Sequence, residues 1–209
     1  MWKFFRVPIS LFGFISNVNK ETTPKSILRK EMRAHLGQIP QPSIDLASEQ
    51  ICHHIARADD LLQKVQTIAL FAAHGPEISL ASLHDILPAK TWVYPLCHPQ
   101  GRLSFHQVTS PAELNPGMLG IGEPDPRLHA ETPLSQIDLI LCPGLAFDKD
   151  GIRLGQGGGF YDRILHRFHG QACGITMATQ VVATIPHEAH DIHVDYLITE
   201  NGIQATRLP

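Results

Sequence analysis

Residues 137–168 read IDLILCPGLAFDKDGIRLGQGGGFYDRILHRF, and three local patterns follow one another along them. The run 137–142 is short and apolar, which is typical of a strand buried on both faces. Glycine dominates 155–159, and apolar residues at Ile164, Leu165 and Phe168 then recur at helical spacing. A strand, a glycine-rich loop and a helix in this order predict one unit of an α/β sheet.

The flanking sequence continues this alternation of strands and helices. We expect a helix that is capped by Thr23, starts at Pro24 and ends before Gly37, a second helix at 43–63 and a short one at 80–87. Strands are predicted at 67–73, 91–96, 103–108, 137–142, 172–176 and 194–199, and the pattern of 103–108 alternates like that of an exposed strand. The predicted fold is α/β: a single domain with a mostly parallel sheet covered by helices on both faces, in a Rossmann-like three-layer arrangement.

The composition is that of a folded globular protein, with 209 residues, 43% hydrophobic and 18% charged. The net charge is −3 and no basic stripe is present, so nucleic acid is not an expected partner. No later segment approaches the roughly 20 apolar residues of a membrane span. The cysteines are far apart without a CxxC pair, which indicates reduced, buried thiols in a cytoplasmic protein; they are Cys52, Cys97, Cys142 and Cys173.

Residues 1–21 differ from the rest of the chain. They combine two early cations with an apolar stretch that is broken by Pro8 and Gly13, and no small-x-small cleavage site follows. We expect a poorly ordered N-terminal extension or an upstream start codon, with a signal peptide as the alternative. The folded domain is then 22–209, and we expect it to be a monomer or a weak dimer.

The glycine run is a candidate phosphate site. Glycine permits positive φ angles, and consecutive free N–H groups can surround an anion, with the following helix and Arg153 adding positive charge. The run is neither a Walker A sequence nor GxGxxG, because Phe160 stands where the last glycine is required. A flexible turn between strand and helix is the alternative interpretation.

Charged residues elsewhere could serve the same ligand. Lys25, Arg29 and Arg33 share one helix face, and a cation as early as Lys25 opposes the helix dipole unless an anion lies nearby. A solvated cationic face is the alternative. Asp162 and Asp191 could hold Mg²⁺ beside phosphates or be ordinary solvated acids, because spacing alone cannot bring them together. The histidines of 187–193 do not have HExxH spacing, so no metal is expected there.

Residues 142–165 as a whole resemble the signature of the 5-formyltetrahydrofolate cyclo-ligase family. The similarity extends to the following short segments: 25–29, 75–77, 94–95, 121–124 and 185–191. The resemblance implies an enzyme that uses ATP and Mg²⁺ to cyclise 5-formyltetrahydrofolate to 5,10-methenyltetrahydrofolate. ATP phosphorylates the formyl oxygen, N10 attacks the activated carbon, and ADP and phosphate are released.

The same resemblance assigns roles to individual residues. It makes Arg153 and Lys25 catalytic, places Arg29, Glu77 and Tyr161 against the folate substrate, and assigns Asp162 and Asp191 to Mg²⁺. The residues implied in ATP binding are Lys25, Ser26, Ile27, Leu28, Arg29, Arg153, Leu154, Gly155, Gln156, Gly157, Gly158, Gly159, Phe160 and Tyr161.

Two positions depart from the family pattern. Phe160 replaces a common tyrosine, and Leu119 replaces an aromatic residue that could stack on the folate. Two other functions remain open, since a fold does not determine chemistry. One is a different enzyme on a similar scaffold, such as a sugar-phosphate isomerase or an acyl-CoA transferase. The other is a regulatory module that binds nucleotide or folate without turnover.

Overall fold

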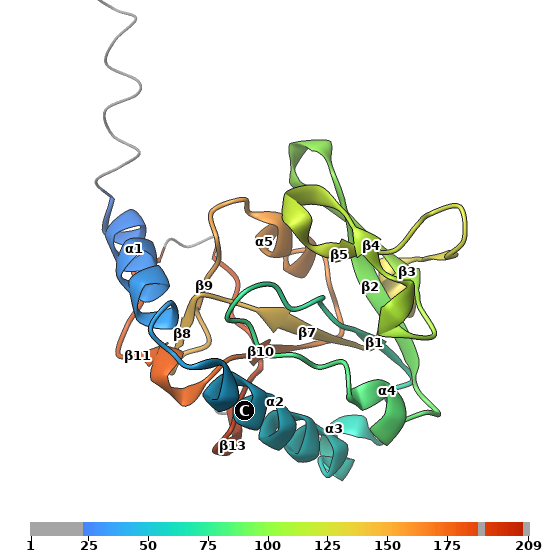
Figure 1. Ribbon diagram of the computed structural model, residues 1–209, viewed down its shortest axis with the longest axis horizontal. Helices are drawn as coiled ribbons and strands as arrows, with labels where there is room; N and C mark the ends of the chain where they lie inside the picture. Colours follow the sequence, from blue (N-terminus) through green and yellow to red (C-terminus); the bar gives the residue numbers. More distant parts are fainter. Residues whose placement is uncertain (1–22, 188–190, 207–209) are drawn as a thin grey trace, which may run out of the picture.

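The protein is built around an eight-stranded sheet with the strand order β13-β12-β10-β7-β1-β2-β3-β6 (Figure 1). The computed structural model describes residues 23–187 and 191–206, so the expected extension 1–21 lies outside the described residues. The strands of the large sheet are β1 (Thr67–Ala69), β2 (Thr91–His98), β3 (Arg102–Gln107), β6 (Glu131–Thr132), β7 (Leu139–Pro143), β10 (Gln171–Ile175), β12 (Tyr196–Thr199) and β13 (Gly202–Ala205).

Five adjacent strands at the centre of the sheet, β12, β10, β7, β1 and β2, are parallel to one another. The outer strands β13, β3 and β6 pair antiparallel. In chain order the parallel strands follow the 2-1-3-4-5 arrangement of doubly wound sheets, in which the chain changes direction between β1 and β7. Folds of this kind bind ligands beyond the carboxyl ends of the two strands at that point.

Helices cover both faces of the sheet, which confirms the predicted three-layer α/β fold. Figure 1 shows α2, α3 and α4 on one side and α5 on the other. Ile68 and Leu70 pack with the first group, whereas Ala69 between them packs with Ile164 and Leu165 of α5. This is the two-residue period of a strand buried on both faces. The helices are α1 (Pro24–Leu36), α2 (Gln41–Ala56), α3 (Asp59–Leu62), α4 (Leu83–Ile86) and α5 (Phe160–Leu165).

The predicted elements differ from the observed ones in two informative places. The helix expected at 43–63 is interrupted, because Ala58 has φ −85° and ψ 68°, outside the helical region. The prediction that the strand at 103–108 is exposed is wrong, since Ser104 and His106 are both buried. Their polar atoms are satisfied within the hairpin: Ser104 Oγ lies 2.7 Å from His98 Nε2 and 2.9 Å from His106 Nε2. Local pairing of this kind allows polar residues into a core.

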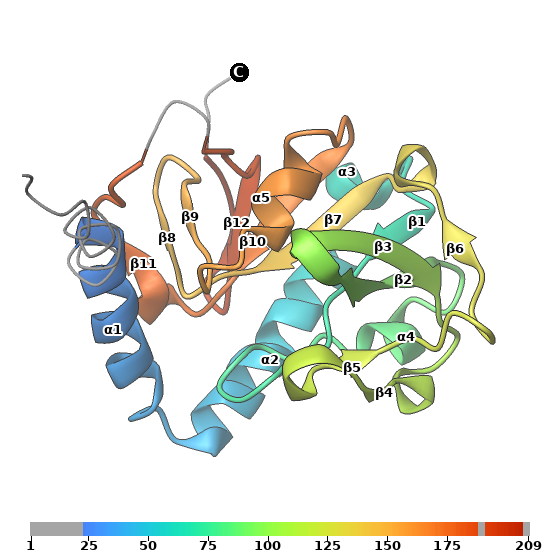
Figure 2. The same ribbon diagram turned by 90° about the horizontal axis from the view of Figure 1, so that it is seen from above.

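Two smaller sheets and several short 3₁₀ helices complete the fold. Sheet β11-β8-β9 consists of β8 (Ala146–Asp148), β9 (Arg153–Leu154) and β11 (Val181–Val182), and β4 (Asn115–Pro116) pairs with β5 (Gly122–Glu123). The 3₁₀ helices are η1 (Pro99–Gly101), η2 (Pro111–Glu113), η3 (Met118–Gly120), η4 (Leu134–Gln136) and η5 (Ala178–Gln180). In both views α1 lies beside β8 and β11 (Figures 1 and 2).

A buried carboxylate orders the turn before the glycine run. Asp148 is 1% exposed and accepts hydrogen bonds from the main-chain N–H groups of Asp150, Ile152 and Ile185. These bonds satisfy the carboxylate and fix the path of the chain from β8 into β9. The glycine run therefore starts from an ordered position.

The cysteines and helices bear on two further expectations. Cys52, Cys142 and Cys173 are buried free thiols, as expected, whereas Cys97 is only half-buried. Among the described residues, no helix combines the length and apolarity that crossing a bilayer would require.

Candidate active site

A cavity of about 250 Å³ lies at the point where the parallel strand order reverses. Phe71 and Ala72, just beyond β1, form part of its wall, and Pro143 and Gly144 at the end of β7 form another part. The cavity is therefore at the carboxyl edge of the sheet, where doubly wound folds bind ligands. Its remaining walls are Glu77, Pro95, Cys97, Leu103, Ile121, Glu123, Arg153, Gly155, Gln156, Gly158, Gly159, Phe160 and Tyr161.

Unsatisfied polar atoms concentrate around this cavity. Of the five buried side-chain N or O atoms without a hydrogen-bond partner in the described residues, three belong to residues of its wall: Glu123 Oε1, Arg153 Nε and Tyr161 Oη. A buried polar atom without a partner is costly and uncommon in a folded protein. Three such atoms on one cavity indicate a polar ligand.

The glycine loop presents its N–H groups without internal partners. Gly157 and Gly159 have φ angles of 107° and 67°, which only glycine adopts readily. Within the described ranges, the main-chain N–H groups of 155–159 donate to no protein acceptor. Such a row of free donors is suited to an anion.

Three arginines bind main-chain carbonyl groups of the loop. The contacts are Arg29 Nε to Gly155 O at 2.9 Å, Arg33 Nη2 to Gln156 O at 3.1 Å and Arg163 Nη1 to Gly158 O at 2.9 Å. Because the carbonyls are held in this way, the loop needs no ligand to fix its direction. The flexible turn that the glycines alone allow does not describe this arrangement.

Arg153 lies under the loop in a buried position, with 6% of its side chain exposed. Its Nη2 donates to Asp162 Oδ1 at 2.6 Å and its Nη1 to Pro143 O at 3.2 Å. The guanidinium carbon lies 5.4 Å from the centre of the Tyr161 ring, within the range of a cation–π contact. Burial raises the pKa of Tyr161, so its hydroxyl stays protonated at neutral pH and can donate.

Lys25 and Asp191 meet although 166 positions separate them in the sequence. Lys25 Nζ donates to Asp191 Oδ2 at 2.5 Å, with 24% and 15% of the two side chains exposed. Thr23 caps the helix as predicted, its side chain accepting from the N–H of Ser26. The Asp191 carboxylate therefore supplies the negative charge that a cation in the first helical turn needs.

The two predicted metal ligands are each paired with a cation, Asp162 with Arg153 and Asp191 with Lys25. The described residues contain no group of three or more His, Cys, Asp or Glu that could hold a metal. Mg²⁺ is commonly held by only one or two protein carboxylates, with phosphate and water completing its shell. The carboxylates fit that mode of binding and do not form a preassembled metal cage.

Two carboxylates line the cavity. Glu77 Oε2 accepts a hydrogen bond from the His74 N–H at 3.0 Å, and burial raises the pKa of Glu77. Glu123 is 7% exposed and lies beside Cys97. Burial, with a smaller contribution from the neighbouring Glu123 carboxylate, raises the pKa of Cys97 to about 12, so this thiol is protonated and poorly nucleophilic.

Four other predicted site residues have side chains outside the cavity wall. Ser26 Oγ donates to Thr23 O, Ile27 is 51% exposed, and Leu28 packs against the core. Leu154 is 1% exposed and pairs with Ala146. Any contact that they make with a nucleotide would involve the main chain or the outer helix face. The side chain of Leu119 is outside the described part of the structure.

A second cavity of about 330 Å³ adjoins the first between α1 and the glycine loop. The two cavities share Glu77, Gly144 and Gln156 as wall residues. Arg33 and His74 belong to the wall of the second cavity and not to that of the first. Two ligands, one in each cavity, would therefore meet at the shared wall. The arrangement is suited to transfer of a group between two substrates.

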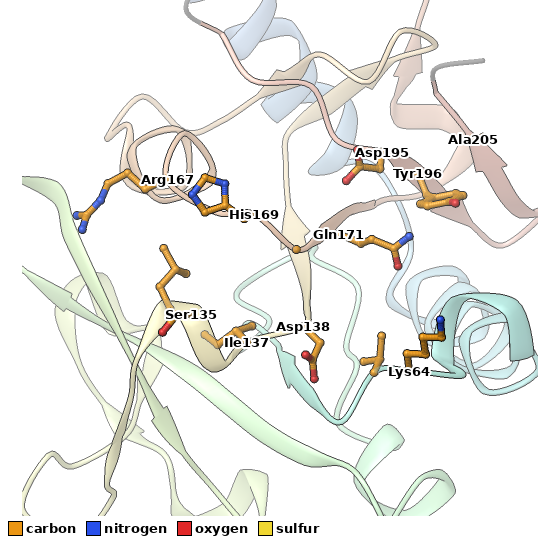
Figure 3. A pocket seen from close by; sticks show the side chains of 13 residues that line it. Lys64, Ser135, Ile137, Asp138, Arg167, His169, Gln171, Asp195, Tyr196 and Ala205 are labelled. Atoms are coloured by element: carbon orange, nitrogen blue, oxygen red, sulfur yellow. The ribbon is translucent and has the colours of Figure 1, made fainter. Parts of the chain in front are cut away.

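A larger cavity of about 1050 Å³ lies at the opposite edge of the sheet, next to the starts of β7, β10 and β12 (Figure 3). Its carboxylates are already used by the fold. Asp138 accepts from the N–H groups of Gln66 and Thr67, and Asp195 accepts from that of Ala172, all at 2.8 Å. These bonds join neighbouring strands. None of the buried side-chain N or O atoms that lack a hydrogen-bond partner in the described residues belongs to the wall of this cavity.

The sequence alone assigned no role to Glu123 or Cys97, which both line the cavity, and it placed Arg33 only on the cationic helix face. Glu123 lies within the 121–124 segment that was recognised as similar to the family, so a signal for it was present. Cys97 had no comparable signal, because its place in the cavity wall depends on the packing of segments that are distant in the sequence.

Most of the chain is similar to proteins of one enzyme family. The model of the 5-formyltetrahydrofolate cyclo-ligase family matches residues 21–200. The 5-formyltetrahydrofolate cyclo-ligase of Haemophilus influenzae is 30% identical over 183 residues, covering 84% of this chain and 95% of that protein. The Escherichia coli K12 protein of the same name is 33% identical over 144 residues, covering 66% of this chain and 79% of that protein.

Two solved structures share the fold. The structure of Aquifex aeolicus 5,10-methenyltetrahydrofolate synthetase superposes with a TM-score of 0.79 at 31% identity, covering 90% of this chain and 95% of that one. The Mycoplasma pneumoniae 5,10-methenyltetrahydrofolate synthetase has a TM-score of 0.69 at 22% identity, covering 85% and 99%. The second likeness concerns the fold alone.

Proposed function

The chain belongs to the 5-formyltetrahydrofolate cyclo-ligase family of enzymes, and from that premise we propose that it converts 5-formyltetrahydrofolate to 5,10-methenyltetrahydrofolate with consumption of ATP. The observation that supports this most is the cavity at the strand reversal. There the unpaired polar atoms of Arg153 and Tyr161 lie beside a loop whose N–H groups are free.

The reaction that we propose has two chemical steps. The γ-phosphoryl group of ATP is transferred to the oxygen of the N5-formyl group, which releases ADP and makes that oxygen a good leaving group. N10 then attacks the formyl carbon and loses its proton, the carbon–oxygen bond breaks, and phosphate departs. The product has a carbon bridge between N5 and N10, and no protein nucleophile takes part.

In this proposal the chain's own residues mainly neutralise charge and hold the substrates in position. The free N–H groups of the glycine loop and the buried guanidinium of Arg153 face the transferred phosphoryl group, where negative charge has to be stabilised. Lys25 binds the outer phosphates from the first turn of α1. The neutral Tyr161 hydroxyl and Glu77 hold the folate in the apolar cavity and limit access of water.

We assign the triphosphate to the α1 side of the loop and the pterin ring to the 250 Å³ cavity. The shared wall of Glu77, Gly144 and Gln156 then lies between the phosphoryl donor and its acceptor. Asp162 and Asp191 would hold Mg²⁺ with the phosphates, which would supply further charge neutralisation. Their present partners, Arg153 and Lys25, would then be available to the nucleotide.

One assay tests the proposed function against its alternatives. The purified chain is mixed with Mg²⁺, ATP and 5-formyltetrahydrofolate at neutral pH, and the near-ultraviolet absorbance of the methenyl product is followed. We expect an increase that requires ATP. A folded preparation that binds both ligands without forming product would indicate a regulatory module, and one that shows no ATP-dependent increase would contradict the proposal.

A further inference from the structure

Glu123 is the most deeply buried acidic side chain in the cavity wall. It lies in β5, opposite Asn115 of β4, and is 7% exposed. Gly117 packs against its carboxyl group so closely that a Cβ atom at 117 would lie 2.3 Å from both Cδ and Oε2. The absence of a side chain at 117 therefore provides the space that the Glu123 carboxylate occupies.

The carboxylate of Glu123 is only partly satisfied by the protein. The Cys97 thiol lies beside it, and Oε1 is buried and has no partner in the described residues. Glu77, the other acid of this wall, has one oxygen engaged by the His74 N–H and does not have a fully buried unpaired atom. Because an unpaired buried carboxylate oxygen is costly, its position implies a ligand that donates hydrogen bonds.

The surroundings of Glu123 limit what that donor can be. Phe71, Pro95, Leu103 and Ile121 make much of the cavity wall apolar and suited to the faces of a flat ring. A carboxylate pairs best with two N–H donors that lie side by side. The reduced pterin ring of the proposed substrate presents such an edge, since its 2-amino group adjoins N3–H.

We propose that Glu123 is a substrate-binding residue that accepts hydrogen bonds from the 2-amino group and N3–H of the pterin ring. The inference rests on the proposed function and deepens it, because it names the residue that recognises the edge of the ring far from the reacting formyl group. Oε1, the buried oxygen without a protein partner among the described residues, is the acceptor that faces the ligand in this arrangement.

The test combines a protein variant with a substrate variant. Glu123→Gln keeps the shape of the side chain but replaces one acceptor oxygen with a donor. The 2-desamino-2-methyl analogue of 5-formyltetrahydrofolate keeps the ring size but lacks the 2-amino donor. Binding of both compounds is measured without ATP by titration calorimetry, so that turnover does not enter the result, and the exposed Glu49→Gln on α2 serves as the matched control.

With the wild-type chain we expect the analogue to bind roughly 10 to 100 times more weakly than 5-formyltetrahydrofolate. Glu123→Gln should weaken binding of 5-formyltetrahydrofolate by a similar factor. It should also reduce the difference in affinity between the two compounds to about threefold or less. The KM for ATP and the behaviour of Glu49→Gln should stay at wild-type values. A role for Glu123 confined to folding would not remove discrimination between the two ligands.

The possible failures can be told apart. If the wild-type chain turns over 5-formyltetrahydrofolate but Glu123→Gln binds and discriminates as the wild type does, the inference is wrong and the proposed function stands. A fall in kcat alone, with discrimination unchanged, also contradicts the inference. If Glu123→Gln does not fold, equal affinity of the wild type for both compounds overturns it. If the folded wild type neither binds nor converts the substrate, the proposed function itself fails.

Discussion

Arg153 shows how single residues of this site combine stability with reactivity. A buried guanidinium is tolerated only where its charge is compensated, and Asp162 and the carbonyl of Pro143 provide that compensation. Its Nε nevertheless has no partner in the described residues. The residue is therefore fixed in place by the fold and retains a donor for a ligand.

We predict that Arg153→Ala lowers kcat by at least about 100-fold, because it removes a preorganised charge from the point of phosphoryl transfer. The variant should still fold, since 44% of the Asp162 side chain is exposed and water can solvate this carboxylate once its partner is lost. Steady-state kinetics and far-ultraviolet circular dichroism check the two statements. Arg153→Lys keeps the charge and loses the planar donor geometry, so its kcat should lie between those of the wild type and the alanine variant. Near-normal kcat in the alanine variant would remove Arg153 from the site.

At the scale of elements, α1 and α5 both act as supports for the glycine loop. Arg33 on α1 donates to the main-chain and side-chain oxygens of Gln156, and Arg163 on α5 donates to the carbonyl of Gly158. Helices on either side therefore hold a segment that has little conformational preference of its own. The loop N–H groups have no acceptor among the described residues and remain available.

We expect Arg33→Ala to raise the KM for ATP several-fold while changing the KM for the folate substrate little. The physical reason is the loss of three hydrogen bonds to Gln156, which lets the loop sample conformations that do not bind phosphate. Faster hydrogen–deuterium exchange of 155–159 should accompany the kinetic change. Lys30→Ala on the exposed side of the same helix is the control, and equal behaviour of the two variants would contradict the role of Arg33.

The sequence was sufficient to predict the order and type of most elements, because apolar runs such as 137–142 and helical spacing such as that of 24–36 are local signals. It failed where tertiary contacts override local pattern. The helix break at Ala58 allows Leu61 and Leu62 to be buried, and the polar residues Ser104 and His106 are buried because each satisfies the other. Neither effect has a signature within a short window.

The candidate site was predictable in its residue types and only partly in its arrangement. Spacing could not indicate that Lys25 and Asp191 form an ion pair, since 166 positions lie between them. Nor could it indicate that Asp162 is held by Arg153, or that Glu123 faces the same cavity as Glu77. These facts follow from the crossing of chain segments at the strand reversal, which a linear pattern does not contain.

At the scale of the whole molecule, the two edges of the sheet differ in how their polar groups are used. At the amino edge, Asp138 and Asp195 accept main-chain N–H groups and thereby join neighbouring strands. At the carboxyl edge, the acids face a cavity, and burial raises the pKa of Glu77. We infer that the polar groups at the carboxyl edge lower the stability of the fold and serve ligand binding, as is common at functional sites.

This difference predicts that Glu77→Gln makes the protein more stable at neutral pH although it weakens folate binding. A carboxyl group whose pKa is raised by folding stabilises the native state below its unfolded value of 4.5, and this contribution is lost as the pH rises through the folded pKa. At neutral pH the ionisation of Glu77 in the unfolded chain therefore favours unfolding, and glutamine removes this effect. The midpoint of thermal unfolding should be higher for the variant at pH 7, by about 2–4 °C for each kcal/mol gained, and equal to that of the wild type near pH 4.

Glu113 provides a control with the opposite sign. Its hydrogen bonds to Thr109 and His129 lower its pKa, so its ionised form stabilises the native state above its unfolded pKa and this contribution is lost as the pH falls through the folded pKa. Glu113→Gln should accordingly lower the unfolding midpoint slightly at pH 7, whereas Glu77→Gln raises it. If Glu77→Gln lowers the midpoint at pH 7 as Glu113→Gln does, burial of Glu77 is not the source of a stability cost. The two edges of the sheet would then not differ in the way that their polar groups suggest.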